Sequence, residues 1–208
     1  MLALTIAVLS CRSTKSLIDR AHEENFTSDP EMIKRVLESG HTSILEHISF
    51  TFTVENASLV ARSQLFRHRL MSVTEQSKRS IDANLIDFII PPAIAKDIVL
   101  TDRFIAAMDR SWDSYSKLVQ MGVHKEDARY VLPVAQSTQF VCTVNGRELF
   151  DVIFPLRMCK RTQEETRDIV NQMYAICMCV VPCVFKLTGP RCIVTGKCNE
   201  MEKCKANG

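Results

Sequence analysis

The segment from Ile48 to Val54 constrains the fold most strongly, because its side chains alternate strictly between apolar and polar. This period of two is that of a strand with one face buried and the other in water. The stretch Thr138 to Val144, rich in β-branched and aromatic residues, is also predicted to be a strand, followed by a turn at Asn145-Gly146. The apolar segment Leu4 to Leu9 alternates too and is predicted to be a buried first strand.

Most of the remaining chain has the period of amphipathic helices. Ser28 to Glu31 has the pattern of a capping box with proline at the start of the helix, which predicts a helix to Ser39. Further helices are predicted over Leu59–Leu70, Thr101–Gly122, Lys125–Leu132, Arg147–Leu156 and Thr162–Val181. Helices outnumber strands and βαβ repetition is missing, so the predicted class is α+β, a modest central sheet packed with helices.

No Pro/Gly/Ser-rich linker divides the 208 residues, which predicts a single domain over residues 1–190 and a polar, cysteine-containing tail over 191–208. The formal charge of +2 is too balanced for a polyanion binder that works through its overall field. We therefore expect no nucleic-acid partner, and any anion site must be local.

Two apolar stretches bear on localisation. Met1 to Leu9 lacks a basic region and is short for a secretory signal. Ile176 to Phe185 contains Pro182 and is far shorter than the roughly 20 residues of a membrane span. We expect a cytoplasmic protein, or one of the host cytoplasm if the source is viral, with no membrane partner.

Seven of the nine cysteines lie from Cys159 onward. An odd number without a convincing export signal favours reduced thiols over disulfides. Their spacing lacks the paired CxxC motifs of a strong zinc site, so no metal is expected, although a zinc or redox site stays open as an alternative.

The stretch from Arg62 to Arg79 carries five basic residues against one acid, Glu75. By spacing alone, a solvated basic face and a local anion site are both open. If the predicted helix holds, Gln64, Arg67 and His68 share one face and Arg69 points the other way. Arginine forks bind phosphate in bidentate fashion, which favours a phosphorylated ligand for the second hypothesis.

Arg67-His68-Arg69, seven residues and then Ser77 is similar to the RHRx7S signature of the flavin-dependent thymidylate synthases. Other segments resemble motifs of the same family in the same order. They are GHTSILEHISFTF (Gly40–Phe52), ARYVLP (Ala128–Pro133), VNGREL (Val144–Leu149) and LRMCKRTQEETR (Leu156–Arg167).

The resemblance implies an FAD-dependent enzyme that methylates dUMP to dTMP without a cysteine nucleophile. It implies methylenetetrahydrofolate as carbon donor, NADPH as reductant, and a homotetramer whose active sites are shared between subunits. One alternative is a non-catalytic module that binds a nucleotide or single-stranded nucleic acid and holds zinc at its cysteine-rich end. Another is an enzyme of a different flavin-dependent uracil methylation pathway, with RNA as the methyl acceptor.

Residue roles follow from the matched motifs. Arg157 is expected to activate the uracil, and Ser77 to orient or polarise it. The expected dUMP-binding residues are Gln64, Leu65, Phe66, Arg67, Glu75, Gln76, Ser77, Lys78, Arg79, Arg129 and Arg157. The expected flavin-binding residues are His41, Ser43, Arg67, His68, Arg69, Glu75, Asn145, Gly146, Arg147 and Asp151.

Four positions depart from the family pattern. Asp151 stands where family members can present an asparagine to the flavin, which puts that contact in doubt. Thr74 replaces a common asparagine, and Ser80 an aromatic residue. Pro155 is an apparent insertion before Arg157, so the helix that leads to this residue is expected to bend differently.

Overall fold

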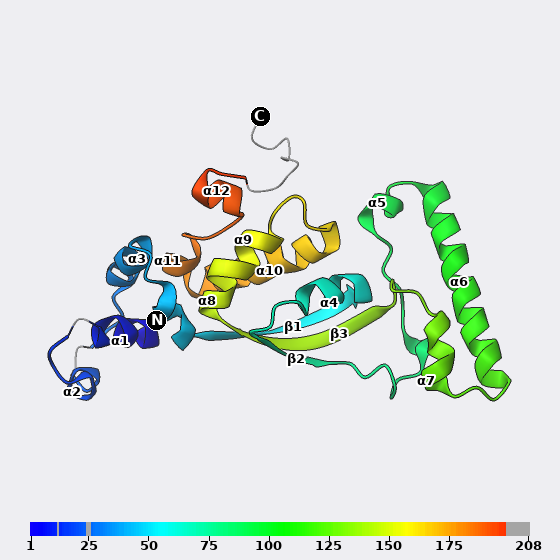
Figure 1. Cartoon of the computed structure of the whole chain (residues 1–208), viewed down its shortest axis with the longest axis horizontal. Coiled ribbons are helices and arrows are strands. Elements are labelled where there is room, and N and C mark those ends of the chain that lie inside the picture. Colours follow the sequence, from blue (N-terminus) through cyan, green and yellow to red (C-terminus); the bar gives the residue numbers. More distant parts are fainter. Residues whose placement is uncertain (12, 24–25, 199–208) are drawn as a thin grey trace.

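The centre of the molecule is a three-stranded antiparallel sheet in the order β1-β3-β2. The computed structural model describes residues 1–11, 13–23 and 26–198. Its strands are β1 (Ser49–Ser58), β2 (Met71–Glu75) and β3 (Ser137–Asn145), and helices lie over one side of the sheet and at both of its ends (Figure 1). This confirms the α+β class with a modest central sheet. The strands predicted over Ile48 to Val54 and Thr138 to Val144 correspond to β1 and β3, and β2 has no counterpart among the predicted elements.

One face of the sheet carries the main core. Phe52 and Val54 of β1 and Phe140, Cys142 and Val144 of β3 are buried, whereas the residues between them face outward. Helices α4 (Leu59–Leu65) and α10 (Glu164–Val180) and the helical segment after β3 cover the buried face (Figure 1). The apolar residues of the alternating pattern are therefore those in the core, and the polar residues between them are those at the surface.

The N-terminal segment is a helix, α1 (Leu2–Ser10), so the predicted strand over Leu4 to Leu9 is wrong. Leu4, Ala7 and Val8 are buried. Their i, i+3, i+4 spacing puts them on one helical face, and α1 contacts α3 (Pro30–Glu38) and η1 (Thr42–His47). Nearly every residue of this run is apolar, so a period of two carries no information about which residues are buried. A short helix, α2 (Leu17–Ala21), connects α1 to α3.

Helix α3 confirms the predicted helix, but its cap differs. Asp29, not Ser28, is the N-cap, and its Oδ1 accepts a hydrogen bond from the Met32 N–H at 2.9 Å. Pro30 occupies the first helical position, where its missing N–H costs nothing. Gly40 ends the segment at φ 85°, a left-handed conformation that favours glycine.

A helical arm extends from the end of the sheet opposite α1 (Figure 1). Its longest helix is α6 (Ile98–Gln120), which confirms the predicted helix there. Tyr115 packs with Ala83 and Ala128 in a small second core, and Trp112 Nε1 donates to the Ala83 carbonyl at 3.0 Å. The other elements of the arm are η2 (Ala83–Leu85), α5 (Pro92–Ala95), α7 (Lys125–Ala128) and η3 (Arg129–Val131).

The helical segment after β3 is continuous but irregular. It consists of α8 (Gly146–Glu148), the π-helix η4 (Leu149–Ile153) and α9 (Phe154–Arg157). Pro155 has no N–H to donate to the carbonyl of Asp151, four residues earlier. A π turn uses one more residue than an α turn, so it accommodates the apparent insertion at Pro155 without ending the helix before Arg157.

The chain continues from α10 through α11 (Pro182–Phe185) to α12 (Arg191–Thr195). The division at residue 190 stays a prediction, and Cys204 lies outside the described residues. Within the described ranges, no helix has both the length and the apolar character needed to cross a membrane.

Candidate active site

The Arg67-His68-Arg69 segment forms a turn between α4 and β2. Helix α4 ends at Leu65, so the predicted helix is wrong from Phe66 to Leu70, and the predicted shared helical face with Gln64 is wrong with it. No glycine or proline marks this end in the sequence. In the turn, His68 is 6% exposed, whereas the two arginines are exposed.

His68 bridges two residues of the helical segment after β3. Its Nδ1 lies 3.3 Å from Glu148 Oε1, and its Nε2 accepts a hydrogen bond from Arg157 Nε at 3.0 Å. Because arginine nitrogens only donate, Nε2 carries no proton and Nδ1–H faces the carboxylate. Burial, followed by the charge of Arg157, lowers the pKa of His68 from its ordinary value of 6.5, and Glu148 opposes this. The imidazole is therefore neutral near pH 7.

Arg157 is held at two of its nitrogens. Besides the bond to His68, its Nη2 donates to the backbone carbonyl of Gln64 at 2.9 Å. Burial and the nearby charge of Arg67 lower the pKa of Arg157, but an arginine keeps its charge in proteins. The predicted activating residue is therefore a fixed, half-buried cation, joined to the signature turn.

The Glu75 side chain points to the face of the sheet that the helices cover, and its carboxylate is hydrogen-bonded there. Its Oε2 accepts two hydrogen bonds from Arg62, at 3.0 and 2.6 Å, and its Oε1 accepts one from Thr138 at 2.9 Å. The Arg62 guanidinium also lies 4.6 Å from the ring centre of Phe66. No role was predicted for Arg62, although it lies in the basic stretch. In this structure Arg62 fixes the Glu75 carboxylate.

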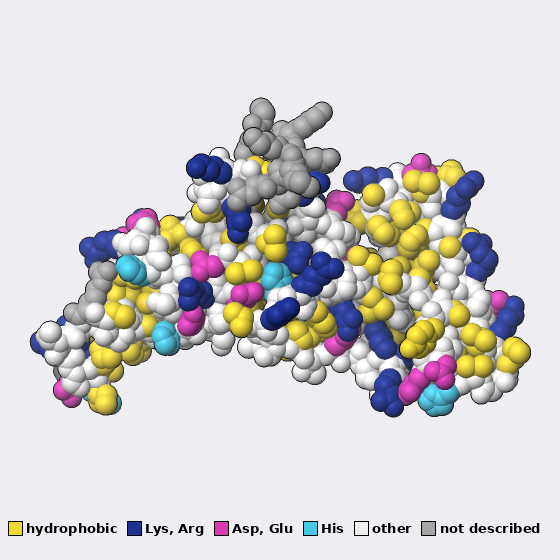
Figure 2. All heavy atoms as spheres, in the orientation of Figure 1, with side chains coloured by type: hydrophobic (Ala, Val, Ile, Leu, Met, Phe, Trp, Pro, Cys, Tyr) yellow, Lys and Arg dark blue, Asp and Glu magenta, His cyan; other side chains and the backbone are white. Residues whose placement is uncertain are grey.

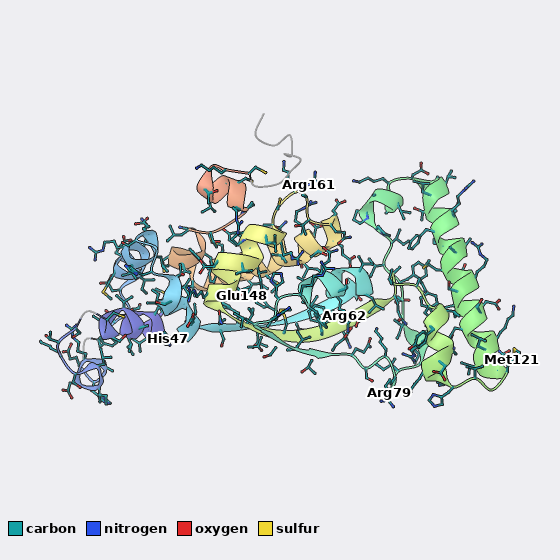
Figure 3. The ribbon with its side chains drawn as sticks, viewed as in Figure 1. His47, Arg62, Arg79, Met121, Glu148 and Arg161 are labelled. Carbon is teal, nitrogen blue, oxygen red and sulfur yellow. The ribbon has the colours of Figure 1, made fainter. Side chains whose placement is uncertain are left out.

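The loop that follows Ser77 is braced by the arm. Arg79, exposed beyond the end of β2 (Figure 3), forms an ion pair with Glu126 of α7. Arg129 Nη2 donates to the Ile81 carbonyl at 3.1 Å, whereas its Nη1 is buried without a hydrogen-bond partner among the described residues. A buried donor without a partner is costly, so Nη1 is suited to donate to a ligand.

Lys78 faces inward and Ser77 faces solvent. Lys78 Nζ donates to the Ser137 carbonyl at 2.7 Å and to Gln76 Oε1 at 3.2 Å. Burial, then the charges of Arg129 and Arg62, lower the pKa of Lys78, and Glu75 opposes them. The exposed Ser77 Oγ accepts hydrogen bonds from the N–H and Oγ–H of Ser80, at 3.3 and 3.1 Å.

His41 and Ser43 line a cavity of about 130 Å³ between η1, α1 and α3. Its walls combine an imidazole, a hydroxyl and the apolar side chains of Val8, Val36 and Ile44, and Cys11 lies at the same cavity. No role was predicted for Cys11, because a lone cysteine beyond the predicted strand over Leu4 to Leu9 does not by itself indicate a binding site.

Arg147 is held by two carboxylates beside this cavity. Its Nη1 donates to Glu46 at 2.5 Å and its Nε to Asp151 Oδ2 at 3.3 Å. The same Asp151 oxygen accepts a hydrogen bond from Thr42 Oγ1 at 2.8 Å, between the cavity residues His41 and Ser43. The hydrogen bonds to Glu46 and then to Asp151 raise the pKa of Arg147.

Asn145 and Gly146 have structural roles in this chain. Asn145 Oδ1 accepts the Glu148 N–H at 2.8 Å and so caps α8. A Cβ on Gly146 would lie 2.7 Å from Ile48 Cγ1 and 3.0 Å from the Leu45 carbonyl, so only glycine allows α8 to pack this closely against η1. Leu65 is 3% exposed within the core and Phe66 packs edge-on against Phe140, so a ligand reaches little of either side chain.

The expected dUMP residues lie at two places, Arg157 with Gln64 at the signature turn and Arg79 with Arg129 beside the arm. The expected flavin residues His41, Ser43 and Arg147 gather at η1 and α8. The arginine, imidazole and hydroxyl donors at the cavity and at Arg147 are those that FAD requires at its sugars and phosphates, so the residues present fit the cofactor. Figure 2 shows basic side chains gathered across the middle of this face. The sequence did not single out the acids that bind Arg147, Arg79 and His68, because an acidic residue in a sequence does not indicate its partner in the fold. These acids are Glu46, Glu126 and Glu148.

The cysteines give no sign of a metal site. Among the described residues, no group of three or more His, Cys, Asp and Glu side chains is arranged to hold a metal ion. Burial raises the pKa of Cys142 to about 11 and that of Cys177 to about 12, so both stay protonated within the core.

Comparisons with known proteins identify the family of the chain. A family model described as thymidylate synthase complementing protein matches residues 2–183. The chain is similar to a flavin-dependent thymidylate synthase of Geobacter sulfurreducens, with 37% identity over 95% of this chain and 85% of the relative. It is also similar to those of Nitratidesulfovibrio vulgaris, 37% identical over 82% and 73%, and Pyrococcus furiosus, 40% identical over 82% and 72%. The chain belongs to the flavin-dependent thymidylate synthase family.

Proposed function

We propose that this chain methylates dUMP to dTMP with FAD as cofactor, methylenetetrahydrofolate as carbon donor and NADPH as reductant. The observation that carries the proposal is the contact between Arg157 and His68. These residues are 89 positions apart, in two separate family motifs, and their side chains meet at 3.0 Å. This contact supports a single site built from the two motifs, with a half-buried cation held in a fixed direction.

The exposed and partly paired arginines are suited to the dUMP phosphate. Arg67 and Arg79 offer planar forks at the surface beside the signature turn and loop, and Arg129 offers the buried Nη1 that has no partner in the described chain. Phosphate accepts several such bonds at once. Binding would hold the nucleotide with its uracil directed toward the turn, where Arg157 lies.

Arg157 would act at the uracil edge. A guanidinium there favours the ionised form of uracil N3, which raises the electron density at C5 and C6 and makes C5 more nucleophilic. Ser77 would orient the ring through a neutral hydrogen bond. Its hydroxyl is bonded to Ser80 and not to a general base, which favours this role over that of a covalent nucleophile.

His41, Ser43 and Arg147 would hold the FAD, the first two at the cavity and Arg147 at a phosphate. When bound, FAD carries reducing equivalents between NADPH and the one-carbon unit that reaches dUMP. Glu46 and Asp151 lie at the surface or close to it. A phosphate of the cofactor would replace one of these acids as the partner of Arg147, so that the guanidinium binds the cofactor.

Self-association as a homotetramer with shared active sites is part of the proposal. The arm exposes large apolar side chains, among them Leu85, Ile98 and Tyr130, and Figure 2 shows hydrophobic side chains gathered over it. Such patches commonly mark protein interfaces. A second copy that covers the arm would also close off the loop that carries Arg79.

The test is a dUMP-dependent assay with purified protein reconstituted with FAD. We expect flavin absorbance in the protein, NADPH oxidation that depends on the folate and dUMP, and dTMP as product by chromatography. Omission of dUMP is the internal control for non-specific flavin oxidation. Protein that neither binds added FAD nor forms dTMP would refute the proposal.

A further inference from the structure

We propose that Glu148 is a positioning residue for this reaction, because through His68 it fixes the direction in which Arg157 presents its guanidinium. The proposal rests on the proposed function for the role of Arg157. It assigns a task to an acid that lies within the VNGREL segment but was given no role there. Figure 3 places Glu148 on the helical segment after β3, above the sheet.

The burial of Glu148 requires a partner. Glu148 is 8% exposed and His68 is 6% exposed. Removal of a carboxylate from water costs free energy unless the carboxylate accepts hydrogen bonds. Among the described residues, the side-chain partner of this carboxylate is His68 Nδ1, at 3.3 Å.

The carboxylate decides which nitrogen of His68 carries the proton. With Glu148 ionised, the proton stays on Nδ1 and Nε2 is left as an acceptor for Arg157 Nε–H. Without it, the proton can occupy Nε2, where it would face the Arg157 donor. Two donors cannot form a hydrogen bond, so Arg157 would lose one of its two fixed contacts and keep the bond to the Gln64 carbonyl.

Acid should undo the same arrangement. The charged groups that face His68 are Glu148 from α8 and Arg157 from α9, and Arg67 in turn faces Arg157. Protonation of His68 at Nε2 removes the acceptor. Because the charge of Glu148 favours the protonated imidazole, Glu148→Gln should lower the pH at which Arg157 is released, while the amide oxygen still accepts from Nδ1–H.

Kinetics on the FAD-loaded enzyme test this. We expect Glu148→Ala to lower kcat by about 10- to 100-fold, the effect of a misdirected catalytic group, with KM for dUMP and bound flavin little changed. Glu148→Gln should recover most of the kcat and move the acid limb of its pH profile to lower pH. Glu38→Gln, at the exposed end of α3, is the control and should behave as the wild type.

Two kinetic outcomes would overturn the proposal. One is a Glu148→Ala variant with wild-type kcat. The other is a Glu148→Gln variant as impaired as the alanine variant, with an acid limb that does not move, because a purely structural carboxylate would give that result. A fall in bound flavin together with kcat would also count against it.

The tautomer can be measured without turnover, by 15N NMR of the imidazoles in the full-length chain. The His68 signals are assigned by their loss in His68→Gln. We expect the Nδ1–H tautomer in the wild type and in Glu148→Gln, and a mixture in Glu148→Ala. An Nε2–H imidazole in the wild type would refute the inference. An Nδ1–H imidazole in protein that forms no dTMP would refute only the proposed function.

Discussion

Glu165 accepts both the backbone N–H and the hydroxyl of Ser58, each at 2.6 Å. The acid lies in the first turn of α10 and Ser58 is the N-cap of α4, where its Oγ also accepts the Ala61 N–H at 3.1 Å. One carboxylate therefore fixes the start of the helix that leads into the signature turn. It places α4 relative to α10, and with it the carbonyl of Gln64 that holds Arg157.

Glu165→Ala should lower the free energy of unfolding by about 2–3 kcal/mol. The substitution removes two charge-assisted hydrogen bonds and leaves the N–H of a buried residue without a partner. Chemical denaturation followed by circular dichroism measures the change. Glu164→Ala is the matched control, because it removes an acid from the same helical turn without these bonds. Equal losses in the two variants would show that only the helix dipole is affected.

The fold could be predicted where apolar and polar side chains alternate clearly along a segment, and not where this contrast is missing. Ile48 to Val54 alternates between apolar and hydroxyl side chains, so burial of one face was readable. Leu4 to Leu9 has no such contrast, and its helix became evident only from the surfaces of α3 and η1. Strand β2 was missed because its inward residue Glu75 is charged, and Arg62 and Thr138 make that burial possible.

For the site, motif resemblance named the residues but not their partners. It proposed His68 as a flavin contact, whereas both ring nitrogens have partners within the chain, Glu148 and Arg157. The end of α4 at Leu65 was not predictable, since the amphipathic pattern continues and no breaker follows. The π turn before Arg157 likewise depends on packing around Pro155, which a helical period does not encode.

The lowered pKa of His68 predicts a loss of stability in acid. The unfolded chain takes up a proton near the ordinary value of 6.5, whereas the folded chain does so only at lower pH. The unfolded state thus binds more protons between these two values, and stability falls as pH decreases through them. We expect the Tm to fall as the pH decreases below the ordinary value of 6.5, and to fall less in His68→Gln. Equal pH dependence in both would contradict this.

Asp151→Asn should tighten flavin binding. The carboxylate competes with an anionic cofactor for Arg147, at 3.3 Å, and the amide would remove this competition while it can still accept from Thr42. A surface ion pair contributes up to about 1 kcal/mol, so we expect roughly 2- to 5-fold tighter binding. Quenching of FAD fluorescence by the apoprotein measures it. Asp102→Asn, exposed on α6, is the control. Weaker binding would mean that Asp151 itself contacts the cofactor.

Arg157→Ala should lose most turnover and keep its flavin. The guanidinium is the cation that we place at the uracil edge, and removal of one such electrostatic group typically costs about 100- to 1,000-fold in kcat. The cavity with His41 and Ser43 lies in other elements, so the FAD content should be unchanged. The measurements are dTMP formation and flavin absorbance. Arg103→Ala, exposed on α6, controls for loss of positive charge. Wild-type dTMP formation would contradict the role.

Ser77→Cys should retain measurable activity. The Ser77 hydroxyl is exposed and bonded to Ser80, a neutral environment that supports orientation and gives no activation of a nucleophile. A thiol is larger and a weaker hydrogen-bond partner, so we expect a higher KM for dUMP and a partial loss of kcat. Ser80→Ala is the companion variant, since it removes the hydroxyl bonded to Ser77. Steady-state kinetics and dUMP binding by calorimetry separate the two effects. Complete loss of turnover with intact dUMP binding would instead assign Ser77 a direct part in the chemistry.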